Sequence, residues 1–403
     1  MKKLIVLFLF CLIGVNMFES CDQVTPTHTM TIFLVLPGGF TVGTVPDGVE
    51  IKVKNLSTGR EVSVKADATG RAEMELAEGN YSLSSSFSLK VENVDYTFNA
   101  NVSEFMLTTP SSAILNLTLA KNTGGFVIKE VYFAGSKTPE AKSYYDDQFH
   151  EIYNNSTDTL FADGLCIGVL EQIGTTPNVW VNSDGTFMDQ YPLAFHIWIV
   201  PGTGKQHPVY PGKSIVIAQD GLNHKSDPNG NPLSPVNLGN ADWESYVDVA
   251  GKDLDYPGVP NLTLMYTSTA SMFDWLHSVN GAGVVIFRLP TTWQTYVADP
   301  ANFKTKPGST SATKFFMIDK KYVIDGVDIV RAEPDKRYKR MHNDVDAGYT
   351  FLESGTYSSK SIRRKAKMII NNRVIYQDTN NSTNDFLHDL VPTPGVNPTS
   401  VEK

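Results

Sequence analysis

Short runs of alternating apolar and polar residues, separated by turns, most limit the folds open to this chain. Residues 49–54 (Val-Glu-Ile-Lys-Val-Lys) alternate with the period of two that a strand with one buried face requires. Residues 31–36 and 113–119 are apolar runs of strand length. Residues 57–59 and 67–70 are glycine-containing turns between such runs. Because short strands at this spacing are typical of sandwiches, we predict an all-β fold.

The length of the chain favours more than one domain. At 403 residues it exceeds the usual size of a single hydrophobic core. The content of 41% hydrophobic and 19% charged residues is ordinary for a globular protein. We predict two β-sandwich domains in tandem, at residues 30–121 and 125–390. A tether at residues 21–29 precedes them, and a polar tail at residues 391–403 follows.

Residues 1–20 are typical of an export signal. Lys2 and Lys3 precede an apolar run, residues 4–15, that is too short to span a bilayer. The sequence Phe-Glu-Ser-Cys at residues 18–21 resembles a lipobox, which leaves the cysteine acylated as the new N-terminus. We therefore predict lipidation of Cys21 and a membrane anchor made by the lipid. The predicted location is the cell envelope, as an outer-membrane lipoprotein that faces the periplasm or the cell surface. An ordinary signal peptide with an incidental cysteine is the alternative.

The cysteines exclude an intramolecular disulfide in the mature chain. Cys11 falls in the signal and Cys21 is the predicted lipid site, so Cys166 is the single remaining thiol. It lies in an apolar, strand-like run at residues 161–169. Because free cysteine is among the most buried residue types, we expect Cys166 in the core and not as a reactive nucleophile.

The charge balance argues against a nucleic-acid partner. The formal net charge is -9 and the pI is near 5.4, whereas phosphate binding needs a basic surface. One stretch, residues 331–373, is basic and contains Tyr338, Tyr349 and Tyr357, which could stack bases. A solvated strand face is the interpretation that we favour for this stretch. Its basic residues include Lys336, Arg337, Lys339, Arg340, Arg363, Arg364, Lys365 and Lys367.

A turn of sequence Asp-Ala-Thr-Gly at residues 67–70 precedes one predicted strand, and Gly79-Asn80-Tyr81 opens the next. This arrangement resembles the transthyretin-like fold of carboxypeptidase regulatory domains. The resemblance implies a non-catalytic spacer or docking module in the first domain. Gly70 and Gly79 also suit turn geometry on simple conformational grounds.

Five segments of the second domain, taken in order, resemble the lamin-tail domain. This is an immunoglobulin-like β-sandwich found in nuclear lamins and in many secreted bacterial proteins. Gly164-Leu165-Cys166 stands where the bacterial pattern usually has a Gly-Trp pair. The segments are residues 126–136, 147–155, 213–218, 361–365 and 378–386.

A long mixed insertion, about residues 191–314, interrupts this lamin-tail-like pattern. It contains loops rich in proline, glycine and asparagine, and candidate short helices around Trp243, residues 273–277 and Trp293. The lipobox, the transthyretin-like module and the interrupted lamin-tail-like module together resemble a Bacteroidetes-type lipoprotein family of unknown function.

No familiar catalytic motif is present, and we predict no catalytic residue and no cofactor. The histidines are scattered singly along the chain. Asp378, Asn380 and Asp385, with Ser382, place oxygen atoms at a spacing that a Ca²⁺ loop uses. A structural turn is the preferred interpretation, because a central glycine and a bidentate glutamate are missing.

Four tryptophans are candidates for a ligand platform, since indole rings stack on sugars and peptides. Filling of the core is the commoner role for such residues. The four are Trp198, Trp243, Trp275 and Trp293.

These features predict a non-enzymatic binding or adhesion lipoprotein. Loops of its sandwich would contact an extracellular protein or glycan, or an outer-membrane partner such as a transporter. One alternative is a hydrolase whose site lies in residues 191–314 and uses Asp220, Asp242 or Asp274 with a histidine. The other alternative is an accessory protein that captures metal or heme.

Overall fold

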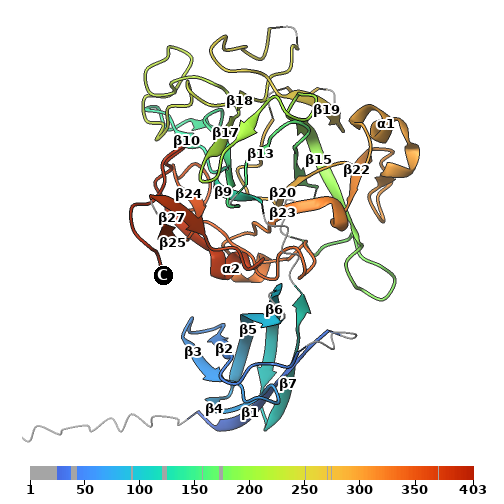
Figure 1. Cartoon of the computed structure of the whole chain (residues 1–403), viewed down its shortest axis with the longest axis vertical. Coiled ribbons are helices and arrows are strands. Elements are labelled where there is room, and N and C mark those ends of the chain that lie inside the picture. The colour runs from blue at the N-terminus through green and yellow to red at the C-terminus, as the bar shows by residue number, and fades with distance from the viewer. Residues whose placement is uncertain are drawn as a thin grey trace, which may run out of the picture.

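The computed structural model confirms the predicted all-β, sandwich-type fold. It describes residues 25–37, 43–91, 94–119, 125–156, 158–171, 176–249, 251–269, 271–273, 275–370 and 372–403. Figure 1 shows two units, with the smaller one below the larger one. We call residues 25–119 the first unit and residues 125–403 the second unit. Cys21 lies outside the described residues.

The first unit consists of two sheets around one core. One sheet has three strands in the order β4-β1-β7, and the other has five in the order β3-β2-β5-β6-β8. Alternation decides which side chains enter the core: Ile51 and Val53 of β2 are fully buried, whereas Lys52 lies on the outer face. The strands are β1 (Thr27–Val35), β2 (Glu50–Asn55), β3 (Glu61–Lys65), β4 (Arg71–Ala77), β5 (Gly79–Val91), β6 (Val94–Leu107), β7 (Ser111–Asn116) and β8 (Thr118–Leu119).

The second unit packs a six-stranded sheet on a seven-stranded sheet. The orders are β18-β17-β12-β9-β24-β27 and β21-β22-β15-β14-β20-β23, with β19 paired to β15. The first sheet comprises β9 (Phe126–Tyr132), β12 (Phe149–Asn154), β17 (Ser214–Ala218), β18 (Trp243–Glu244), β24 (Ser361–Arg364) and β27 (Phe386–Leu390). The second comprises β14 (Cys166–Leu170), β15 (Gln190–Ile199), β19 (Thr263–Thr267), β20 (Val284–Phe287), β21 (Phe303–Thr305), β22 (Lys314–Asp319) and β23 (Val323–Val327).

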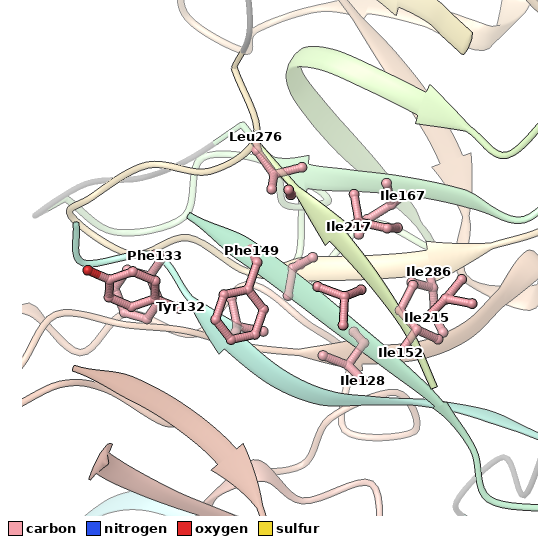
Figure 2. Close-up of a cluster of buried hydrophobic side chains, with 14 of the residues drawn as sticks. Ile128, Tyr132, Phe133, Phe149, Ile152, Ile167, Ile215, Ile217, Leu276 and Ile286 are labelled. Carbon is pink, nitrogen blue, oxygen red and sulfur yellow. The ribbon is translucent and has the colours of Figure 1, made fainter. Parts of the chain in front are cut away.

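The main core fills the space between these two sheets. Ile128 and Ile152 of the six-stranded sheet meet Ile167 and Ile286 of the seven-stranded sheet, and all four are at most 2% exposed. Figure 2 shows these side chains converging with those of Phe149 and other apolar residues. Burial of this much branched aliphatic surface is the main source of stability in such a fold.

The seven-stranded sheet is buried on both faces. Ile167 points into the main core, while its neighbour Cys166 points into a second apolar cluster on the opposite face. The predicted core position of Cys166 is therefore confirmed, and burial raises the pKa of its thiol. The short helix α1 (Trp293–Ala298) lies on this side, and its capping residue Thr292 accepts a hydrogen bond from the Thr295 amide.

The segment at residues 191–314, predicted as an insertion, is part of the sandwich itself. It supplies most of β15, and all of β17, β18, β19, β20 and β21. Its apolar runs have to be buried, as the fully buried β20 shows. Of the three predicted helices only the one at Trp293 forms. Trp243 lies in β18, and among the described residues 271–273 and 275–277 there is no helix.

The remaining elements are short and lie around the sheets of the second unit. A hairpin of β25 and β26 lies outside the six-stranded sheet, with Ala366 and Tyr376 in a small cluster with Val127. The elements are β10 (Ser136–Lys137), β11 (Ser143–Tyr144), β13 (Leu160–Phe161), β16 (Pro208–Val209), β25 (Ala366–Ile370), β26 (Arg373–Tyr376), α2 (Ser382–Asp385) and three 3-10 turns at Pro300–Asn302, Lys320–Tyr322 and Pro334–Lys336.

Residues 391–403, predicted as a polar tail, are docked on the body of the second unit. Lys129 and Glu151 form an ion pair whose side chains are both 0% exposed, with 2.7 Å between Nζ and Oε1. The Lys129 ammonium also donates to the Val396 carbonyl (2.8 Å), and the Gly395 amide donates to Glu151 (3.1 Å). Because buried charges need several hydrogen-bond partners, this segment is required to complete the pair.

Glu130 provides a test of this docking. It accepts hydrogen bonds from the Ser361 hydroxyl (2.5 Å) and the Thr393 amide (3.2 Å), and burial raises its pKa from 4.5 to about 7. Since its pKa is higher in the folded state, its contribution to stability is present at low pH and is lost as the pH rises to about 7. We expect Glu130→Gln to flatten the fall in unfolding free energy between about pH 5 and pH 7, by up to about 1.4 kcal/mol per pH unit.

Urea unfolding at several pH values measures this slope. The exposed Glu104→Gln variant is the matched control and should retain the slope of the parent protein. Equal slopes for Glu130→Gln and the parent would contradict the assignment.

Candidate functional site: a cleft between the two units

The outer face of the five-stranded sheet is polar and forms the floor of a cleft. Lys52 lies opposite Ser84 and Lys54 opposite Ser82, on neighbouring strands β2 and β5. Asn101 of β6 lies on the other side of Ser84. The alternation that buries Ile51 and its equivalents in the core turns these side chains toward the second unit. The floor therefore offers ammonium, hydroxyl and amide groups.

Arg364, at the end of β24, organises the opposite wall. Its side chain is almost completely buried and pairs with three carboxylates, which we call the Arg364 cluster. The distances are 2.7 Å to Asp325, 3.1 Å to Asp378 and 3.4 Å to Asp385. A planar guanidinium can bind several oxygens in fixed directions. Arg364 therefore holds both ends of the loop formed by residues 378–385.

The oxygen cluster that was considered as a Ca²⁺ loop thus surrounds a different cation, the Arg364 guanidinium. Asp385 also accepts hydrogen bonds from the amide and hydroxyl of Thr379, each at 2.8 Å. Asn380 adopts a φ of 50°, which asparagine tolerates, and its carbonyl accepts from the Ala347 amide. Among the residues that the structure describes, no group of three His, Cys, Asp or Glu is placed to hold a metal ion.

Lys365 emerges from this wall into the cleft. It follows Arg364 directly, and its own amide donates to the Asp385 carbonyl at 2.7 Å. Because successive side chains of an extended chain point in opposite directions, Arg364 lies inside and Lys365 faces the first unit. Lys365 is half-buried, and burial together with the nearby positive charge of Lys52 lowers its pKa.

The cleft consists of two adjoining cavities that share Lys52 and Ser84. Their volumes are about 240 Å³ and about 400 Å³. At the end of the smaller cavity, the Arg337 guanidinium lies 4.2 Å from the centre of the Phe351 ring, and His388 stacks on Phe351 at 5.1 Å. Further lining residues are Ser86, Tyr349, Lys367, Gln377, Thr379, Ser382, Thr383 and Asn384.

Positive charge dominates the lining of the cleft. Six lysine and arginine side chains face two side-chain carboxylates, Glu50 and Glu61. Lys52 lies 3.8 Å from Glu61, and within the described parts of the chain this is the one ion pair that the six make. The six are Lys52, Lys54, Arg337, Lys365, Lys367 and Lys403.

The two units touch beside the cleft. Asn99 of β6 donates from its side-chain amide to the Thr379 carbonyl and, at 3.4 Å, to the Asn380 carbonyl. Asn99 is 0% exposed, although it lies on the outer face of its sheet. Figure 1 shows α2, which follows these residues, at the edge of the second unit nearest to β6. The Arg364 cluster thus holds both the wall of the cleft and the contact with the first unit.

The predicted tryptophan platform does not form at this site. Trp198 and Trp243 belong to the main core, at 1% and 6% exposure, and Trp275 packs against it. Trp293, the first residue of α1, packs against the second cluster. Large aromatic side chains bury their area most effectively inside the sandwich, which explains this placement.

The basic stretch at residues 331–373 is not the solvated strand face that we expected. Arg340, Arg363 and Arg364 are at most 9% exposed, and they donate hydrogen bonds to the Tyr338 carbonyl, to Glu402 and to Asp325, respectively. The part of the stretch that reaches the cleft includes Arg337 and Lys365. The sequence analysis did not predict this cleft. The pattern that could have indicated it is the alternation of buried and cationic residues in β2 and around Arg364.

Two of the residues named for the hydrolase alternative, Asp220 and Asp242, lie among the described residues. The Asp242 carboxylate accepts from the Val216 amide at 2.8 Å. Near Asp220, His224 Nε2 lies 3.2 Å from the backbone carbonyl of Asp220, and burial lowers the pKa of His224 to about 4. Asp274 lies outside the described residues.

Two histidines that are far apart in sequence meet in the core. His150 Nε2 lies 2.9 Å from His277 Nδ1, and burial lowers the pKa of His150 to about 3. Phe133 stacks on His277 at 5.2 Å. The pair is thus a neutral, tightly packed part of the sandwich, which sequence spacing alone did not indicate.

Comparison with known proteins finds a family without an assigned role. The model of a family described as protein of unknown function (DUF4876) matches residues 210–393. No curated protein matches the chain. The solved structure of a DUF4876 family protein from Bacteroides thetaiotaomicron is 27% identical, with a TM-score of 0.61. This match covers 93% of the present chain and 99% of that one.

Two further structures are of DUF3823 family proteins, each 13% identical. The one from Parabacteroides merdae has a TM-score of 0.19 and covers 37% of this chain and 68% of that one. The one from Bacteroides ovatus has a TM-score of 0.18 and covers 48% and 99%. In the described residues, no helix has the length and apolar character needed to cross a membrane.

The Arg364 cluster gives a direct test of how the wall is held. We expect Arg364→Leu to lower the free energy of unfolding by about 3–5 kcal/mol, because it leaves buried carboxylates without their cation. Arg331→Leu removes a more exposed pair with Glu333 and should cost less than about 1 kcal/mol. Urea unfolding followed by tryptophan fluorescence measures both. A loss for Arg364→Leu no larger than that for Arg331→Leu would contradict this role.

Proposed function

We propose that this chain is an acylated lipoprotein of the cell envelope that binds an extracellular polysaccharide in the cleft between its units, without catalysis. The observation that carries this proposal is the lining of the cleft. Its floor and walls combine hydroxyl, amide and cationic groups, with aromatic rings at one end. Such groups hydrogen-bond to sugar hydroxyls, whereas a small apolar ligand would need an apolar, enclosed pocket.

The arrangement of the first unit supports an anchored binding protein. The predicted lipid site, Cys21, precedes β1 by only a few residues. β1 lies in the three-stranded sheet, whereas the floor of the cleft is the outer face of the five-stranded sheet. The first unit therefore separates the anchor from the cleft, which directs the cleft away from the membrane.

The wall of the cleft is formed by loops on a rigid scaffold, which supports a role in binding a ligand. Residues 348–351 and 377–385 lie between strands of the second unit, and the Arg364 cluster fixes the second of these loops. Loops held in this way can contact a ligand without losing much conformational freedom on binding.

Filling the cleft should weaken polysaccharide binding. We expect Ser84→Trp to weaken binding by at least about tenfold, which corresponds to about 1.4 kcal/mol, because the indole would occupy the point shared by both cavities. Ser112→Trp, on an exposed position of β7, is the matched control and should bind as the parent does. Affinity electrophoresis in gels containing dextran, galactomannan, polygalacturonate, alginate or chondroitin sulfate measures retention. A parent protein that none of these gels retains, or a Ser84→Trp variant retained as well as the parent, would contradict the proposal.

Lipidation is tested separately. In cells that are fed an alkyne-labelled palmitate, the parent protein should carry the label and sediment with membranes. Cys21→Ser should carry no label, whereas Cys11→Ser, within the apolar run of the signal, should still be labelled. Label on Cys21→Ser equal to that on the parent would exclude acylation at this cysteine.

A further inference from the structure

Lys52 and Lys365 approach each other from opposite walls of the cleft. Lys52 belongs to the floor, on β2, and Lys365 to the wall that follows β24. The two charges are close enough for Lys52 to lower the pKa of Lys365. Like charges that are brought together in a partly desolvated space repel each other, so this arrangement costs free energy in the unliganded protein.

The neighbouring carboxylates relieve this repulsion only in part: Asp385, Glu402 and Glu61 raise the pKa of Lys365, but burial and Lys52 lower it by more. Glu61 lies 3.8 Å from Lys52, and both side chains are about half exposed, at 44% and 50%. An exposed pair of this kind contributes little. Neither Lys365 nor Lys367, two residues further along the chain, makes an ion pair within 4.0 Å among the described residues. An anion placed between the two walls would be attracted to both lysines, and these two attractions would outweigh their mutual repulsion.

We propose that the polysaccharide is acidic, and that Lys52 and Lys365 together bind one of its carboxylate or sulfate groups. This inference rests on the proposed function of the cleft and names the class of its ligand. Ser84 and Thr379 border the two lysines and donate to or accept from the hydroxyls of the same sugar chain. Lys54 and Arg337 extend the positive lining toward the smaller cavity, where a second acidic group binds.

The cleft suits an acidic polysaccharide better than a nucleic acid. Single-stranded nucleic acids bind through bases that stack on open aromatic faces. The Phe351 ring already packs with Arg337 at 4.2 Å and with His388 at 5.1 Å. Tyr349 lies 6.5 Å from Phe351 in a tilted arrangement. The abundant serine side chains of the floor instead match ligands that carry many hydroxyl groups.

The decisive experiment compares charged and neutral forms of one polymer. Polygalacturonate, alginate and chondroitin sulfate serve as acidic probes, and carboxyl-reduced polygalacturonate as the neutral counterpart of the first. We expect the parent protein to bind at least one acidic probe. Binding should weaken at least tenfold between about 50 mM and 500 mM NaCl, because salt screens charge. The carboxyl-reduced polymer should bind at least tenfold more weakly than polygalacturonate if the latter is the probe bound.

The double variant Lys52→Gln with Lys365→Gln tests the two lysines themselves. It should bind the acidic probe at least about tenfold more weakly. Lys205→Gln with Lys225→Gln removes the same charge from exposed positions outside the cleft and should bind as the parent does. Thermal unfolding of all variants shows whether each is folded.

The outcomes separate this inference from the proposed function. Binding of dextran or galactomannan that Ser84→Trp abolishes, but that salt and the double lysine variant leave unchanged, would overturn the acidic ligand and retain the cleft. Failure to bind any polysaccharide would overturn both. Tighter binding of a single-stranded oligodeoxynucleotide than of every acidic probe would also overturn the inference.

Discussion

The buried guanidinium of Arg364 is the interaction on which the site depends. It joins Asp325, on the edge strand β23 of the seven-stranded sheet, to Asp378 and Asp385 on either side of one loop. The burial of so many charges is unfavourable unless each finds partners, and the hydrogen bonds of Asp385 show how completely this is met. The same loop then forms the wall of the cleft and receives the hydrogen bond from Asn99. The buried cation thereby holds the loop that carries this contact between the two units.

Strand alternation places neighbouring residues on opposite faces, so that one is buried in a core and the next faces the cleft. Arg364 enters the interior while Lys365 faces the cleft, and Ile51 enters the first core while Lys52 forms the floor. A shift of register by one residue would bury the lysines and expose the core. The positions of the cationic side chains are therefore as strongly determined as the hydrophobic core, although they lie at the surface.

The elements that were predictable from sequence are those set by local pattern. The alternation of residues 49–54 correctly indicated a half-buried strand, and the apolar run around Cys166 indicated a buried one. The Arg364 cluster was not predictable, because Asp325 is distant from Arg364 in sequence. Without knowledge of such partners, a basic residue is expected to be exposed to solvent. The docked segment at residues 391–403 was missed for the same reason, since it completes the buried pair of Lys129 and Glu151. The cleft has walls from both units, so no local pattern could show it.

The net charge of the whole chain favours binding of an acidic polymer in the cleft over binding elsewhere on the protein. With a net charge of -9, the chain as a whole repels a polyanion, while six cationic side chains attract it at one place. Specificity is a difference between affinities, and repulsion elsewhere contributes to that difference as much as attraction in the cleft. The field between the two walls is also focused by the protein on either side. An acidic protein can therefore bind an acidic polymer at one defined site, because its net negative charge disfavours that polymer elsewhere.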